Sequence, residues 1–217
     1  RRMWLQVRAK NENGATVYES GAYDPSTGVL THDEDLKLYE IHSGLSPALA
    51  SALGLAAGPS FHFVLCDSVY VDNRIPPRGF TNAGFASVQS PPVAYSYADG
   101  AYWDDTAYHL PSTADSVEVS LYYQSTSKEY IEFLRDENNT NSAGQDLHNA
   151  WVAQGRCSPV LMQRRVVPVN VTVDVAERGG GDAILAFEIG RAAPNPFHGT
   201  TTLAFALPRS ALVRIAV

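Results

Sequence analysis

The residue types that carry most protein chemistry are scattered along this sequence and match no known catalytic motif. No serine stands in the Gly-x-Ser-x-Gly turn that exposes a nucleophile, and Gly179 to Gly181 lack the Lys-Ser/Thr that follows a phosphate-binding loop. None of the six histidines has a partner at metal-ligand spacing; they are His32, His42, His62, His109, His148 and His198. The sequence therefore predicts no catalytic residue, no metal site and no cofactor-binding residue in this chain, and hence no enzyme.

Acidic residues gather in two short clusters and on one predicted helix. Residues 32–35 and the pair Asp104-Asp105 could offer oxygen ligands to calcium, but neither matches a known calcium loop, so solvated turns are the preferred interpretation. The helix carries four carboxylates, which could be imagined as a glycosidase-like pair. Solvation and pairing with Lys128 or Arg135 is the simpler prediction for Glu129, Glu132, Asp136 and Glu137.

Two cysteines, Cys66 and Cys157, leave two alternatives open. A disulfide between them would fit an oxidising compartment, whereas two free thiols would behave as small buried hydrophobes. Neither cysteine stands in Cys-x-x-Cys or Cys-x-x-Cys-His, so this chain carries no zinc-knuckle, thioredoxin-type or haem-attachment motif.

An aromatic-rich segment also has two interpretations. Aromatic rings on the surface of an extracellular domain can stack on sugars, and they can equally pack into a core or contact another protein. Sugar binding requires Tyr102 and Trp103 to be exposed side by side. The segment contains Tyr95, Tyr97, Tyr102, Trp103 and Tyr108.

Composition excludes several classes of protein. The 217 residues are 45% hydrophobic, which is ordinary for a globular chain. The net charge of −7 gives no basic footprint for nucleic acid. No apolar run approaches the roughly 18 residues that a membrane span requires.

Strand patterns dominate the elements that would hold these residues. Alternating or β-branched runs predict strands at 4–9, 16–20, 37–41, 61–65, 68–71, 116–123 and 166–175. Ser127 is positioned to cap a helix over 128–135, a second helix is expected at 145–152, and 47–57 is either a short helix or an irregular loop.

Many short strands and few helices predict an all-β fold. We expect a β-sandwich, Ig-like or jelly-roll-like, with one or two short helices, followed by a partial second β domain. The sandwich should span 1–175, a Gly-rich linker and connecting strand 176–193, and the second domain 194–217. The residues at both ends suggest one part of a longer polypeptide.

Two stretches resemble known families. GPSFHFVL (58–65), DNRIPPRGFTN (72–82) and YYQSTSKEYIEFL (122–134) resemble the haem-free region that follows the haem-binding part of some bacterial multihaem c-type cytochromes. The resemblance covers roughly residues 1–175 and implies an exported protein whose haem, if any, lies upstream or in a partner. This chain departs from those cytochromes in having no haem-attachment motif, so the resemblance assigns electron transfer to no residue of this chain.

The second stretch lies near the end of the chain. PNPF (194–197), TLAFALP (202–208) and VRIAV (213–217) are similar to the start of the C-terminal Ig-like sorting domains, FlgD-like and linked to type IX secretion, of many exported bacterial proteins. This similarity implies export and attachment at the cell surface.

These observations predict a non-catalytic extracellular structural or interaction module that mediates assembly, as a filament or surface layer, or anchors a multihaem cytochrome. The alternatives are a haem-free subunit of an extracellular redox complex and a carbohydrate-binding module. The expected partner is protein, by self-association or by packing against cytochrome domains. An apolar strand could assemble by adding to an exposed sheet edge; its residues would be Thr202, Leu203, Phe205, Leu207, Val213, Ile215 and Val217.

Overall fold

The computed structural model describes residues 1–169, 188–189 and 205–206. The chain forms two compact units, Arg1–Asn170 and Val171–Val217. In the second unit β11 (Glu188–Ile189) pairs antiparallel with β12 (Phe205–Ala206). The glycines of the expected linker lie outside the described residues.

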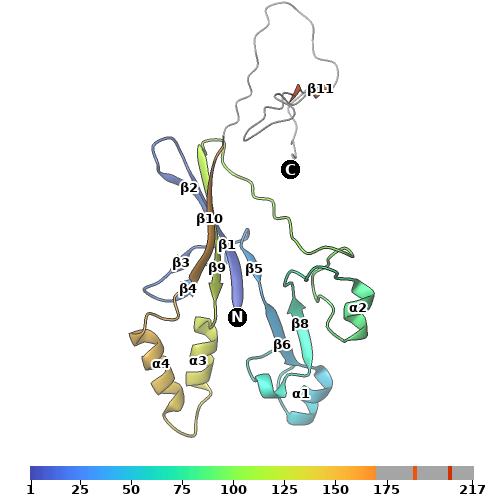
Figure 1. Cartoon of the computed structure of the whole chain (residues 1–217). Helices are drawn as coiled ribbons and strands as arrows, with labels where there is room; N and C mark the ends of the chain where they lie inside the picture. Colours follow the sequence, from blue (N-terminus) through green and yellow to red (C-terminus); the bar gives the residue numbers. More distant parts are fainter. Residues whose placement is uncertain (170–187, 190–204, 207–217) are drawn as a thin grey trace, which may run out of the picture. The chain divides into compact units, whose positions relative to one another are not determined.

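A five-stranded antiparallel sheet organises the first unit (Figure 1). Its strands are β1 (Arg2–Lys10), β2 (Thr16–Ser20), β5 (Lys37–Tyr39), β9 (Ser116–Gln124) and β10 (Val160–Pro168). Their order is β10-β9-β1-β2, and β5 pairs with the first half of β1. The β1–β2 connection is the hairpin that Asn13-Gly14 predicts, because Gly14 has φ 76° and the Asn11 side chain accepts the amides of Asn13 and Ala15.

The two faces of this sheet are covered by different kinds of side chain. On one face Val7, Ala9 and Val117 pack with Ala114 in an apolar core. On the other face Trp4 is fully buried and stacks on Tyr122, with ring centroids 5.5 Å apart. The strand alternation puts apolar residues on one side as expected, but it does not reveal that the polar side is also covered.

A second, three-stranded sheet has the order β7-β6-β8. It comprises β6 (Ile41–Leu45), β7 (Gly58–Pro59) and β8 (Ser68–Asp72), with α1 (Pro47–Leu53) and the 3-10 helix η1 (Phe63–Leu65) in its connections. Ser46 caps α1 by accepting the amide of Leu49. The unit also contains a two-stranded ribbon, formed by β3 (Tyr23–Asp24) and β4 (Val29–Leu30), and the peripheral helix α2 (Asn82–Ser87). Two further helices, α3 and α4, complete it.

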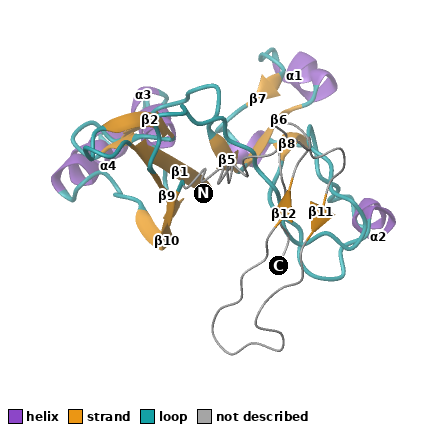
Figure 2. Cartoon of the chain, turned by 90° about the horizontal axis from the view of Figure 1, so that it is seen from above, coloured by secondary structure: helices purple, strands orange, loops and turns teal. Residues whose placement is uncertain are grey.

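Helices α3 (Lys128–Asp136) and α4 (Ala143–Ala153) lie side by side (Figure 2). Ser127 caps α3 through the amide of Tyr130, as the sequence predicts. Each helix buries one large side chain, Ile131 and Trp151. The two helices approach closely because Gly144 of α4 lies against the carbonyl of Leu134, where a side chain would not fit.

The chain is mostly β, with several antiparallel sheets and a few short helices, which confirms the predicted fold class. Two helices, α1 and α2, are present beyond the two that were predicted with defined bounds. No helix among the described residues is both long and apolar enough to cross a bilayer.

Three strand predictions need correction. Residues 61–65 form no strand, because Phe61 and Phe63 pack on Tyr130 of α3 and the chain turns into η1. The expected strand 37–41 is two strands, β5 and β6, which belong to different sheets. The strand expected at 166–175 begins earlier, as β10 at Val160, and its continuation beyond 169 lies outside the described residues.

Candidate interaction site

The most unusual feature of the described residues is the edge strand β10. All nine of its residues are exposed, although the strand pairs along its length with β9. The large apolar side chains on it are Val160, Leu161, Met162, Val166 and Val167. A strand that is open on both faces and along its edge is a template for pairing with another strand.

The register shows which side of the sheet each exposed apolar residue joins. Val167 lies opposite Val117, whereas Val166 lies opposite Glu118, so neighbouring valines of β10 project from opposite faces. In an antiparallel ladder every second residue of an edge strand directs its N–H and C=O away from the partner strand. An incoming strand would therefore find backbone hydrogen-bonding groups and apolar side chains together.

Parts of the opposite edge of the sheet make polar contacts within the chain. Asn73 donates its side-chain amide to the carbonyl of Leu38 in β5 at 2.6 Å. Asp33 accepts the Ser20 hydroxyl at 2.7 Å and the Gly21 amide at 2.8 Å, where β2 ends. These contacts hold one backbone carbonyl of β5 and the end of β2.

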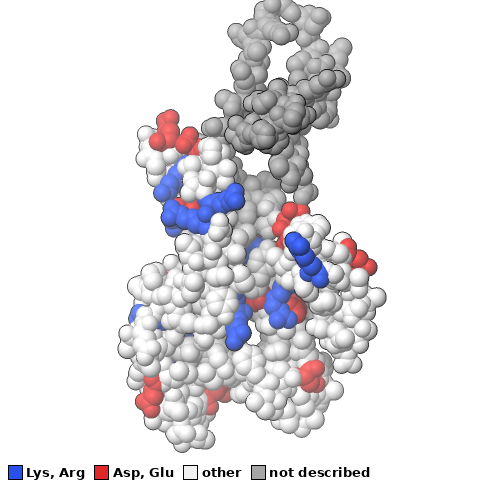
Figure 3. Space-filling model, in the orientation of Figure 1, with Lys and Arg blue, Asp and Glu red and all other residues white. Residues whose placement is uncertain are grey.

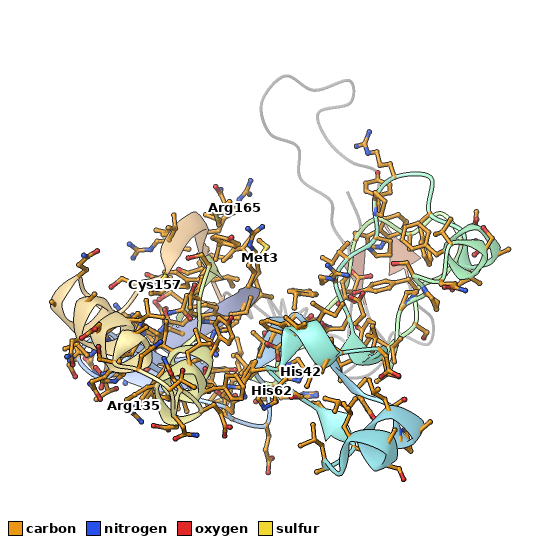
Figure 4. The ribbon with its side chains drawn as sticks, turned by 90° about the horizontal axis from the view of Figure 1, so that it is seen from below. Met3, His42, His62, Arg135, Cys157 and Arg165 are labelled. Atoms are coloured by element: carbon orange, nitrogen blue, oxygen red, sulfur yellow. The ribbon has the colours of Figure 1, made fainter. Side chains whose placement is uncertain are left out.

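Some features of β10 moderate its tendency to pair. The register shifts between Leu161 and Gln163, and Pro168 has no N–H to donate. Arg164 pairs with Glu118 of β9, and Arg165 lies at the periphery of the unit (Figure 4). Lys and Arg side chains gather over the part of the surface where β2 and β10 lie (Figure 3). A partner strand for β10 should therefore carry little positive charge.

The residues proposed from sequence as an assembly strand are described only in part. Phe205 lies in β12, where it pairs with Ile189. Thr202, Leu203, Leu207, Val213, Ile215 and Val217 lie outside the described residues.

The disulfide considered between Cys66 and Cys157 is not formed, and both thiols are free. Cys66 follows η1, with its sulfur 3.4 Å from the carbonyl oxygen of His62. The Cys157 thiol follows α4 and lies 3.0 Å from the Ser125 hydroxyl. Each sulfur thus has its own hydrogen-bonding partner, in a different connecting segment of the chain.

The five histidines that the structure describes form no common centre. His42 lies on β6 and His62 just before η1, whereas Cys157 and Arg135 lie in the part that holds α3 and α4 (Figure 4). His62 does not face away from its aromatic neighbours, as a strand would require; its ring meets Phe133 edge-on, with centroids 4.9 Å apart. No group of three potential metal ligands occurs within the described part of the chain.

The acidic clusters are used as hydrogen-bond acceptors. Burial acts to raise the pKa of Asp33, but the bonds from Gly21, Ser20 and Asp35 outweigh it and lower the pKa. On α3, Glu132 pairs with Lys128 and Asp136 with Arg135, as expected from the sequence.

Asp104 belongs to a polar and aromatic cluster that sequence inspection missed. The Lys37 ammonium lies 2.6 Å from its carboxylate, 2.9 Å from the Tyr95 hydroxyl and 4.4 Å from the Tyr95 ring centroid. Burial acts to lower the pKa of Lys37 and to raise that of Asp104, yet their mutual bond and the Tyr95 hydroxyl shift both pKa values the other way. The cluster ties β5 to the segment around residue 104, which is a structural role.

Comparisons with known proteins add little. No protein-family model matches the chain, and no curated protein matches it. A solved structure, the penta-heme cytochrome c552 from Thermochromatium tepidum, is similar over 77% of this chain at 14% identity, with a TM-score of 0.39. The chain covers 30% of that cytochrome, and a likeness this weak carries no inference about function.

Proposed function

We propose that this chain is a non-catalytic structural module of an exported bacterial protein and that it assembles through the edge of β10. The observation that carries the proposal is the nine-residue exposed edge strand, with apolar residues on both faces. The export component rests on the two sequence resemblances described above. A role in anchoring a multihaem cytochrome rests on the first resemblance alone.

The edge chemistry favours a strand from a second copy of this chain as the occupant. Residues 201–208 read Thr-Thr-Leu-Ala-Phe-Ala-Leu-Pro, and residues 212–217 read Leu-Val-Arg-Ile-Ala-Val. The first run is uncharged and the second carries one arginine, so the first suits an edge that already holds Arg164 and Arg165. Strand addition uses main-chain hydrogen bonds for affinity and alternate side chains for specificity.

The test blocks the edge with charge. The double variant Met162→Lys/Val166→Lys puts two ammonium groups on β10, where natural edge strands often carry lysine to prevent pairing. The matched control Val64→Lys/Val88→Lys replaces two apolar residues that are also highly exposed but lie elsewhere. Analytical ultracentrifugation over a concentration series measures the assembly state, and circular dichroism confirms that each variant is folded.

We expect the native chain and the control to associate and the edge variant to sediment as a 23.5 kDa monomer. A native chain that stays monomeric throughout the series, or an edge variant that assembles like the native chain, would overturn the proposal. Deleting residues 200–217 identifies the donor: loss of assembly supports this segment, and unchanged assembly shows that another strand occupies β10.

A further inference from the structure

An exposed aromatic pair lies far in sequence from β10. Tyr102 is 45% exposed and Trp103 is 53% exposed. Their rings meet edge to face, with centroids 5.0 Å apart and an interplanar angle of 88°. The guanidinium of Arg78 lies 4.7 Å from the centroid of the Tyr102 ring, so a cation and two aromatic rings share one small surface.

The backbone beneath this surface is held on both sides. Ala101 is buried with Phe80 and Tyr97 in a small core, and the Gly100 amide donates to the Phe80 carbonyl at 2.7 Å. On the other side Asp104 is fixed by its ion pair with Lys37. Rings carried on an anchored segment lose little conformational freedom when they bind a ligand.

The exposed area of the Tyr102–Trp103 pair favours a small sugar ligand over a protein partner. Each aromatic side chain can bury roughly 150–250 Å², and about half of each ring here is already covered. The pair therefore offers on the order of 200 Å², against about 800 Å² per partner in a typical stable protein interface. Trp, Tyr and Arg also dominate protein hot spots, but so small an area matches one or two sugar units better than a protein.

We propose that Trp103, Tyr102 and Arg78 form a binding site for a pyranose-based glycan. The C–H face of a sugar ring packs on the exposed indole of Trp103. A hydroxyl or carboxylate oxygen of the sugar accepts a hydrogen bond from the Arg78 guanidinium. A pyranose presents a flat apolar face with a polar rim, and these two contacts match both. The inference is independent of assembly at β10.

Intrinsic fluorescence is a selective probe of this site. The chain has three tryptophans, and Trp4 and Trp151 are buried, so only Trp103 should respond to a surface ligand. The probes are soluble neutral and acidic polysaccharides, and pull-down on insoluble cellulose, chitin and peptidoglycan extends the range. The variants are Trp103→Ala and Arg78→Met, with Phe63→Ala as the control because Phe63 is an exposed aromatic residue on η1.

We expect a blue shift of the native fluorescence with at least one polysaccharide, and retention on the matching insoluble glycan. Trp103→Ala should abolish retention, Arg78→Met should weaken it about tenfold, and Phe63→Ala should bind as the native chain does. Absence of any response across the panel, or full retention by Trp103→Ala, would overturn the proposal. A Trp103→Ala variant that changes only self-association would show a protein contact in place of the glycan site.

Discussion

Removing the ammonium of Lys37 should destabilise the first unit substantially. The Lys37 and Asp104 side chains are only 14% and 9% exposed, so the variant Lys37→Met leaves a carboxylate in a largely buried site. Breaking a buried ion pair by removing one partner costs about 3–5 kcal/mol. Asp104 keeps two hydroxyl donors, from Tyr95 at 3.0 Å and Tyr39 at 3.2 Å. We therefore expect a cost just below that range, about 2–3 kcal/mol.

The assay is urea unfolding followed by fluorescence and circular dichroism, with thermal unfolding alongside. For a unit of this size each kcal/mol shifts the Tm by about 2–4 °C, so a fall of roughly 5–10 °C is expected. Lys128→Met is the control, because the Lys128–Glu132 pair is 3.9 Å long and more exposed and should contribute at most about 0.5 kcal/mol.

The pH dependence gives a second criterion. The pKa of Asp104 is lowered in the fold, so its stabilising contribution is complete above the unfolded pKa of about 3.9 and is lost as pH falls through the lower folded value. The pKa of Lys37 is raised, so its contribution is lost only at alkaline pH above about 10.4. The gap between native and Lys37→Met should thus be full at neutral pH and shrink in acid. A loss below about 1 kcal/mol, or a gap that does not change with pH, would refute this reasoning.

Two further outcomes follow from the buried core and the thiols. Trp4→Phe keeps an aromatic ring but removes the indole N–H that donates to the Gly21 carbonyl at 3.1 Å. Urea unfolding should show that the free energy of unfolding falls by about 1–3 kcal/mol. An unchanged unfolding midpoint would contradict this expectation. Because Cys66 and Cys157 are free, unfolded protein prepared without reductant should titrate two thiols per chain with a thiol reagent, and reductant should leave the Tm unchanged. A count of zero would show that the pair is oxidised.

Sequence patterns predict the elements whose order is set locally. The hairpin after β1 follows from Asn13-Gly14, and α3 begins where Ser127 can cap it. The same reasoning fails at Phe61 and Phe63, because their partners lie on α3, almost seventy residues further along the chain. A β-like run of residues became a turn and η1 through contacts that no local pattern contains.

The sequence predicted the kind of site, an apolar strand that pairs at a sheet edge, but not that β10 would be the exposed edge strand. Alternating valines indicate a strand near 166, and such a pattern is typical of a strand with one buried face. The pattern cannot show whether another layer of the protein actually covers that face. In the structure Val166 and Val167 are both exposed. The Lys37–Asp104 pair left no sequence signal, since an ion pair between distant residues has no characteristic spacing.

The unequal edges of the five-stranded sheet also limit the symmetry of any assembly built from it. When β10 of one copy pairs with β10 of another, two sheets join edge to edge as a closed two-fold pair. Such a dimer consumes both open edges and stops growing. An unlimited filament requires a head-to-tail contact, in which each copy offers an acceptor and a separate donor. The size of the assemblies therefore distinguishes the two modes of pairing. A population that ends at dimers indicates β10 paired with β10, and open-ended polymers indicate a donor strand other than β10.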